Sequence, residues 1–188
     1  KDKTTNEYVP LKWDSSQFKL DDTYVNEHFA LPGSNAPAVI AWKAPYTGTV
    51  TLSHQDTVYR DGAPETAEDI TATLKLNNNE LWSHTFDKTC TNTAEKRATY
   101  TIQDVNVNKG DVIYHEVDCG TNTEGRYIYW KPIVTYTEME VIPDKTQTAY
   151  KRTVAYPVGA HGYHGWYFYK KDKTTNEYVP LKWDSSQF

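Results

Sequence analysis

The residues of this sequence best suited to chemistry are its aromatic side chains. Fifteen tyrosines and six tryptophans stand beside a single methionine among 188 residues. An exposed Tyr or Trp ring offers a flat apolar face to the pyranose ring of a sugar and a polar group at its rim. The candidates for a glycan-binding surface are Tyr46, Tyr59, Tyr127, Tyr129 and Trp166. The alternative is that these rings fill the core or pack between domains, because the chain has enough aromatic residues for both roles.

A second group of candidates is acidic and lies in or next to residues 55–68, which are expected to form a long loop. Oxygen-rich loops bind Ca²⁺ when several carboxylates and carbonyls converge. The weak calcium candidates are Asp56, Asp61, Glu65, Glu68 and Asp69. Their spacing matches no known calcium motif, so a solvated loop is the favoured alternative. No other cofactor is expected.

Catalytic motifs are missing from the sequence. It contains no Gly-x-Ser-x-Gly segment of the kind that presents a nucleophilic serine. Two carboxylates for glycoside hydrolysis need only meet in space, but no two acids stand out from the rest. The chain is therefore expected not to be an enzyme.

The two cysteines, Cys90 and Cys119, each lie just past an expected strand. In a secreted chain this arrangement favours one disulfide. The alternative is a pair of buried thiols.

The most specific feature of the sequence is a duplication. Residues 1–18 (KDKTTNEYVPLKWDSSQF) recur without a change as residues 171–188. Neither copy has the Gly/Ser composition of a flexible linker, and each carries large apolar residues. These residues are the expected contacts between neighbouring modules: Tyr8, Leu11, Trp13 and Phe18 in the first copy, and Tyr178, Leu181, Trp183 and Phe188 in the second.

The duplication predicts three parts: a connector over 1–18, a domain over 19–170, and a second connector over 171–188 that starts the next repeat. A natural tandem array is favoured over an engineered duplication, although both explanations remain open. Each unit of such an array would be a whole domain with its own core. Since Lys1 is not a start residue, the chain is expected to be a fragment of a longer precursor.

The elements expected to position these residues are short strands. Residues 37–43 (PAVIAWK) form an apolar run typical of a strand buried on both faces, and residues 69–76 alternate between apolar and polar. An Asn-Asn-Asn turn at 77–79 then precedes a hairpin partner at 80–86. Further strands are expected at 49–54, 97–103, 111–117 and 126–136, the last interrupted or at a sheet edge near Pro132.

Turns every 8–12 residues and the absence of long amphipathic helical patterns predict an all-β fold. The expected architecture is an antiparallel, jelly-roll-like sandwich of two sheets with about 8–10 strands. The net charge of −5 argues against nucleic acid as a partner, and no apolar run is long enough for membrane insertion. A secreted or cell-surface location is expected.

Two stretches resemble a known class of module. Residues 39–52 (VIAWKAPYTGTVTL) resemble the opening hairpin of carbohydrate-binding-type jelly-roll accessory modules, and residues 108–136 resemble a closing motif of the same modules. Such modules also occur within insecticidal-toxin and Rhs-type shell proteins, where a segment similar to residues 162–169 (GYHGWYFY) follows them. The resemblance implies a β-sandwich fold over about residues 37–170.

Three functions follow as hypotheses. The duplication favours a non-catalytic structural repeat of an extracellular fibre, stalk or adhesin filament, joined to neighbouring copies of itself by strand addition or docking. The alternative is a carbohydrate-binding module that uses surface Tyr and Trp residues to bind glycans. The second alternative, a shell domain of a large toxin-type protein, rests on the resemblance.

Overall fold

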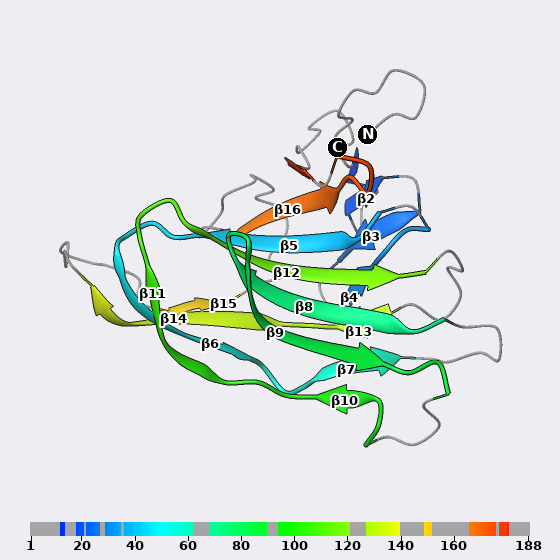
Figure 1. Cartoon of the computed structure of the whole chain (residues 1–188), viewed down its shortest axis with the longest axis horizontal. Coiled ribbons are helices and arrows are strands. Elements are labelled where there is room, and N and C mark those ends of the chain that lie inside the picture. Colours follow the sequence, from blue (N-terminus) through cyan, green and yellow to red (C-terminus); the bar gives the residue numbers. More distant parts are fainter. Residues whose placement is uncertain are drawn as a thin grey trace.

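The computed structural model describes the chain in pieces, namely residues 12–13, 18–20, 22–26, 29–34, 36–61, 68–89, 94–120, 127–139, 149–151, 166–175 and 177–180. All regular elements within these ranges are β-strands, which pair in antiparallel fashion into three sheets (Figure 1). These ranges include no helix with the length and hydropathy needed to cross a membrane. The predicted all-β sandwich class is confirmed.

One layer of the sandwich is a six-stranded sheet. Its strands, in spatial order, are β17 (Tyr178–Pro180), β16 (Trp166–Lys171), β5 (Ala38–Lys43), β12 (Val112–Cys119), β8 (Ile70–Leu76) and β9 (Asn79–Phe86). The apolar run at β5 lies between β16 and β12, and its residues from Ala38 to Trp42 are fully buried. This is why β5 carries apolar residues on both of its faces. The β8–β9 turn contains Asn77 at φ 52°, in the left-handed region that asparagine tolerates.

The opposite layer consists of two sheets. The four-stranded sheet contains, in order, β11 (Ile102–Val107), β6 (Gly48–His54), β14 (Pro132–Met139) and β15 (Ala149–Lys151). The seven-stranded sheet contains β1 (Lys12–Trp13), β2 (Phe18–Leu20), β3 (Thr23–Val25), β4 (Phe29–Leu31), β13 (Tyr127–Tyr129), β7 (Val58–Asp61) and β10 (Arg97–Ala98). Both sheets pack against the six-stranded sheet through one apolar core.

Three chain segments run through both sheets of this layer. Strand β6 leads into β7, β10 leads into β11, and β13 leads into β14. Each pair is separated by two or three residues without strand structure: 55–57, 99–101 and 130–131. The layer is therefore a single surface with a break across it (Figure 1).

The core lies between the layers and is rich in aromatic residues. Trp42 of β5 packs against Tyr136 of β14, with ring centroids 5.8 Å apart. The ring of Trp130, at the break, packs against those of Trp82 of β9 and His115 of β12, with centroid distances of 5.8 and 5.1 Å. Trp42, Trp82, Trp130 and Tyr136 therefore serve packing, which is the role that the alternative interpretation gives to aromatic residues.

Several expectations about individual elements are wrong in detail. The structure has more and shorter strands than the expected 8–10, since the break divides strands that the sequence pattern joins. The expected strand at 97–103 is replaced by β10 and β11, and β13 and β14 lie where one strand was expected at 126–136. The segment 55–68 is not a continuous loop, because it contains β7, which pairs with both β10 and β13.

The expected disulfide is not supported. Cys119, at the end of β12, is a buried thiol whose sulfur lies 3.9 Å from the carbonyl oxygen of Gly33 and 3.6 Å from that of Gly120. These contacts place the thiol against main-chain acceptors. Cys90 lies outside the described residues.

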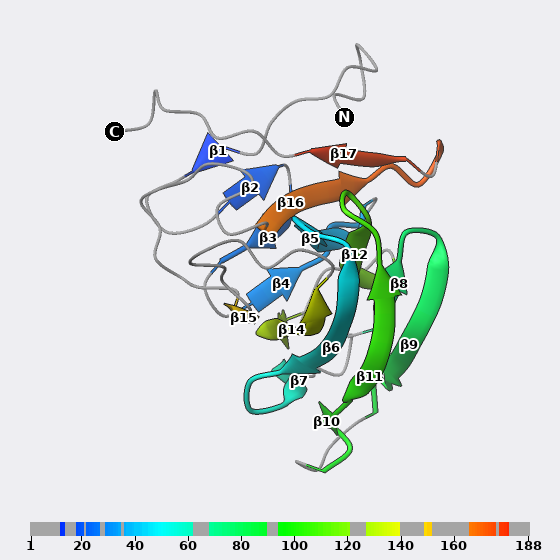
Figure 2. The same cartoon turned by 90° about the vertical axis from the view of Figure 1, so that its left-hand side faces the viewer.

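Both copies of the duplicated segment contribute strands. From the first copy, β1 pairs with β2, which begins at Phe18 and pairs with β3. From the second copy, β17 pairs with β16 at the edge of the six-stranded sheet. Figure 2 shows β1 and β17 at the same end of the molecule. Tyr8, Leu11, Leu181, Trp183 and Phe188 lie outside the described residues, and the predicted domain boundaries stay predictions.

Candidate functional site

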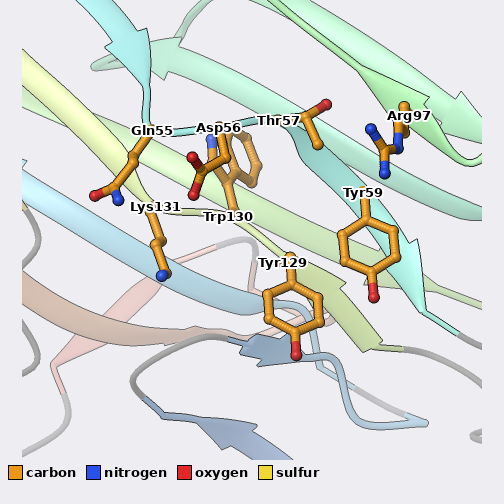
Figure 3. Close-up of a pocket in the computed structure, with 8 residues that line it drawn as sticks. All are labelled: Gln55, Asp56, Thr57, Tyr59, Arg97, Tyr129, Trp130 and Lys131. Atoms are coloured by element: carbon orange, nitrogen blue, oxygen red, sulfur yellow. The ribbon is translucent and has the colours of Figure 1, made fainter.

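The second layer of the sandwich is the one made of the four- and seven-stranded sheets. The break in this second layer opens into a pocket of about 440 Å³, a size within the range of small-molecule sites. Its lining residues belong to the three chain segments that cross the break, and lie either in the break or in a strand next to it (Figure 3). They are Gln55, Asp56, Thr57, Tyr59, Arg97, Tyr129, Trp130 and Lys131. Three segments far apart in the sequence therefore meet at this one site.

One side of the pocket belongs to a row of aromatic side chains that runs across three strands. Tyr59 of β7 lies opposite Tyr129 of β13, and Tyr129 lies opposite Phe29 of β4. The rings of Tyr59 and Tyr129 are stacked, with centroids 4.7 Å apart and an interplanar angle of 15°. The ring of Phe29 is 4.1 Å from that of Tyr129 and 5.5 Å from that of Tyr127. We call these four residues, Phe29, Tyr59, Tyr127 and Tyr129, the aromatic ladder.

Strand alternation places the aromatic ladder on the outer face of the layer. The neighbouring residues Val58 and Ile128 are fully buried in the core, and successive side chains of a strand point to opposite faces. Tyr59 and Tyr129 are half-buried, and Tyr127 is exposed, at 43%. The ladder forms through the register between strands, so the sequence showed its tyrosines only as separate candidates.

The row continues beyond the tyrosines to a cation. Arg97 of β10 is the cross-strand partner of Tyr59, so the order across the sheet is Arg97, Tyr59, Tyr129, Phe29. Tyr59 thus has Tyr129 on one side and the exposed Arg97 on the other. A planar ligand that meets this wall would contact ring edges, phenol hydroxyls and the guanidinium group.

The other side of the pocket is polar. The turn between β6 and β7 carries Gln55 and Asp56, both exposed, and Asp56 adopts a left-handed φ of 62°. The main-chain N–H of Gln55 donates to the main-chain carbonyl of Lys131, at 2.9 Å. This hydrogen bond holds the two interrupted segments together. Figure 3 shows the side chains of Gln55, Asp56 and Lys131 on this side, with the tyrosines on the other. The pocket therefore offers an amide, a carboxylate and an ammonium group next to aromatic rings.

A buried hydrogen-bond network supports the pocket from below. Trp130 is fully buried, and its indole nitrogen donates to the hydroxyl of Tyr100, at 3.0 Å. That hydroxyl donates to the carbonyl of Ser53, at 3.1 Å. The amide of Tyr100 in turn donates to Nε2 of His54, at 3.1 Å. The network ties the ends of β6 and β13 to the segment between β10 and β11.

Burial sets the protonation of this network. It raises the pKa of the Tyr100 phenol well above its ordinary value, so the hydroxyl stays a donor near neutral pH. Burial also lowers the pKa of His54, against smaller opposing effects of the Gln55 backbone and Asp56. A neutral imidazole is what the geometry requires, because Nε2 accepts a hydrogen bond.

The five predicted glycan-binding residues divide into two groups. Tyr59, Tyr127 and Tyr129 come together in the aromatic ladder. Tyr46 lies elsewhere, half-buried, with its ring 6.3 Å from that of Tyr136 and its amide and carbonyl bonded to the Tyr136 hydroxyl. Trp166 begins β16 in the six-stranded sheet, opposite Trp42 of β5.

Gln55, Thr57, Arg97, Trp130 and Lys131 complete the pocket, and Phe29 completes the aromatic ladder. None of them had a signal of its own in the sequence. Phe29 and Arg97 join the tyrosines only through strand register. Gln55 and Lys131 join them only through the alignment of two breaks. Pro132 predicted an interruption or a sheet edge nearby, but not which residues would gather around it.

The calcium candidates do not form a cluster where the structure describes them. Asp56 lines the pocket, whereas the carboxylate of Asp69 accepts from the amide of Lys88, at 2.8 Å. Glu68 offers its carbonyl to Arg60, at 2.8 Å. Asp61 is the last residue of β7, and Glu65 lies outside the described residues. Among the described residues no three His, Cys, Asp or Glu side chains gather as metal ligands, so calcium stays a prediction.

Comparison with known proteins gives one informative similarity. The chain is 28% identical over 136 residues to a lacto-N-biosidase of Bifidobacterium longum subsp. longum. The aligned region covers 68% of this chain and 8% of that much longer protein. No protein-family model matches the chain. The similarity thus relates this β-sandwich to a small part of a protein that has the name of a glycosidase.

Proposed function

We propose that this chain is a non-catalytic carbohydrate-binding module whose ligand occupies the pocket at the break in the second layer. The observation that carries the proposal is the pair of stacked tyrosines, Tyr59 and Tyr129, beside Gln55, Asp56 and Lys131. Sugar recognition needs apolar area for the C–H faces of the ring and fixed polar groups for its hydroxyls. The edges of the stacked tyrosine rings give the apolar area, and Gln55, Asp56 and Lys131 give the polar groups.

The similarity to part of a lacto-N-biosidase supports this proposal. The matched region is 8% of that protein, an extent that suits an accessory module. The activity itself would then belong to other parts of such a protein, while this module would hold a glycan. Lacto-N-biose and oligosaccharides that contain it are accordingly the first ligands to test.

The experiment is a calorimetric titration of the chain with lacto-N-biose, lactose, N-acetylglucosamine and sialyllactose. We expect saturable binding of at least one of them. Tyr59→Ala should weaken it at least tenfold, because it removes one ring of the stacked pair, and Lys131→Ala should weaken it as well. Lys109→Ala is the matched control, since the exposed Lys109 lies outside the pocket. No binding at millimolar sugar, or equal affinity in all variants, would overturn the proposal.

A second candidate function is that of a structural repeat in a surface fibre, stalk or adhesin. The observation that favours it is the unchanged recurrence of residues 1–18 as 171–188. It is compatible with glycan binding, because arrays of binding modules gain avidity. Its test is Trp13→Ala together with Trp183→Ala in a chain of two units. Unchanged association and unchanged stiffness between the units would contradict it.

A further inference from the structure

We infer that the boundary between successive units falls inside the duplicated segment, at Leu181, so that its first ten residues complete one unit and its last seven open the next. The inference rests on the tandem-array interpretation given above. It concerns an interaction surface whose partner is a second copy of this unit.

The first part of the second copy is bound to the unit that precedes it. Lys171 ends β16, and its ammonium group lies 3.7 Å from the carboxylate of Glu116 on β12. Lys173 lies 3.0 Å from the carboxylate of Asp118 and donates to the carbonyl of Cys119, at 3.4 Å. These contacts fix the beginning of the copy on the outer face of the six-stranded sheet.

A hairpin turn then returns the chain to the same sheet. The carboxylate of Asp172 accepts from the amides of Thr174 and Thr175, at 2.7 and 2.8 Å, and the amide of Asp172 donates to the carbonyl of Glu177, at 3.0 Å. Strand β17 follows and pairs with β16, with Val179 opposite Lys170. It ends at Pro180, which has no amide hydrogen to continue the ladder. The sequence KDKTTNEYVP is thus the closing element of a unit.

The last seven residues of the duplicated segment have a different structural role. In the first copy, Lys12 and Trp13 form β1, the outermost strand of the seven-stranded sheet. Strand β1 pairs with β2, which starts at Phe18, and β2 pairs with β3. The sequence KWDSSQF is thus the opening element of a unit. Because the two copies are identical, a unit that followed this one would use residues 182–188 in the same way. A unit that preceded it would use residues 1–10 as this unit uses 171–180.

Only Leu181 separates the closing strand from the opening strand under this assignment. Pro180 is the last residue of β17, and Lys182 is equivalent to Lys12, the first residue of β1. A link of one residue cannot span more than a few ångströms. Neighbouring units therefore contact each other through the end of the molecule where β1 and β17 lie (Figure 2). The array is an ordered assembly and not a flexible string.

The first test uses the present chain. Deleting residues 1–10 should change the midpoint of thermal unfolding by less than about 2 °C, since these residues close a different unit. Deleting residues 178–188 should lower the midpoint by more than 5 °C, because it removes β17 from the sheet edge. An equal loss from both deletions, or a greater loss from the first, would overturn the assignment of the boundary.

The second test uses a chain of two units, residues 1–188 followed directly by 19–188, studied by small-angle X-ray scattering. We expect one fixed separation between the units. Six Gly/Ser residues inserted after Leu181 should broaden the distance distribution and leave the unfolding midpoint unchanged, whereas the same insertion after Val179 should lower the midpoint. If the first insertion lowers the midpoint and the units are rigid without it, the boundary is wrong but the tandem repeat stands. If the two-unit chain is flexible without any insertion, the structural-repeat function fails as well. Neither result bears on glycan binding by a single unit.

Discussion

Removing the hydroxyl of Tyr100 should destabilise the fold from beneath the pocket. In Tyr100→Phe the indole N–H of the fully buried Trp130 loses its acceptor at 3.0 Å, and the carbonyl of Ser53 loses a donor at 3.1 Å. A buried donor left without a partner costs about 1–3 kcal/mol, and a lost hydrogen bond about 1 kcal/mol. The free energy of unfolding should therefore fall by roughly 2–4 kcal/mol. For a domain of this size that corresponds to a decrease in Tm of roughly 4–15 °C.

A double-mutant cycle separates the hydrogen bond from the loss of packing. Trp130→Phe removes the donor, and the double variant removes both partners. The double variant should therefore lose less stability than the sum of the two single variants, because no orphaned N–H remains. Urea denaturation followed by circular dichroism measures all four proteins. Tyr127→Phe, at the exposed rung of the aromatic ladder, is the control and should be neutral. A loss below about 0.5 kcal/mol in Tyr100→Phe, or additive single effects, would refute the proposed role of this network.

Three further predictions concern other parts of the fold. Glu116→Gln should lower the free energy of unfolding in urea by roughly 1–3 kcal/mol, because the Glu116 side chain is 8% exposed and its carboxylate lies 2.6 Å from Lys75 and 3.7 Å from Lys171. Asp118→Asn, in a more exposed pair with Lys173, should lower it by less than about 1 kcal/mol. Equal losses in the two variants would contradict this view of the sheet face. Gly48→Ala should destabilise the fold by roughly 1–3 kcal/mol, because a Cβ atom would lie 2.2 Å from the backbone carbonyl oxygen of Glu138. An unchanged midpoint of urea unfolding would mean that the β6–β14 pairing is looser than described. Burial lowers the pKa values of His54 and His84 below 6.5 in the folded protein, so the unfolded chain binds protons first and stability should fall as the pH drops through 6.5. In His54→Gln this dependence should be smaller, and an unaltered dependence between pH 7.5 and 5 would exclude His54 as a cause.

The parts of the fold that follow local pattern rules could be predicted from the sequence. The apolar run at β5 and the alternation at β8 each reflect burial along a single strand, with Ile70, Ala72 and Leu74 directed into the core. The Asn-rich turn reflects the conformational preference of asparagine at Asn77. Each of these signals lies within a window of a few residues, so no knowledge of distant neighbours was needed.

The break and the site that it forms could not be predicted in this way. Whether residues 99–101 continue a strand depends on where the neighbouring segments 55–57 and 130–131 are interrupted. The convergence of Arg97, Tyr59 and Phe29 depends on the register of four strands that lie far apart in the sequence. Tyr127 and Tyr129 were separate candidates in the sequence, and nothing local linked them to Tyr59.

The central claim, that the pocket at the break binds a glycan, is tested most directly by mapping the contact in solution. Each sugar of the panel, lacto-N-biose first, is titrated into ¹⁵N-labelled protein, and the amide chemical shifts are followed by NMR. The account predicts that the largest shifts cluster at residues 55–59, Arg97 and residues 129–131, and that in Tyr59→Ala at least tenfold more sugar is needed to reach shifts of the same size. Shifts centred on the six-stranded sheet around β16, or no shifts with any sugar of the panel, would contradict it.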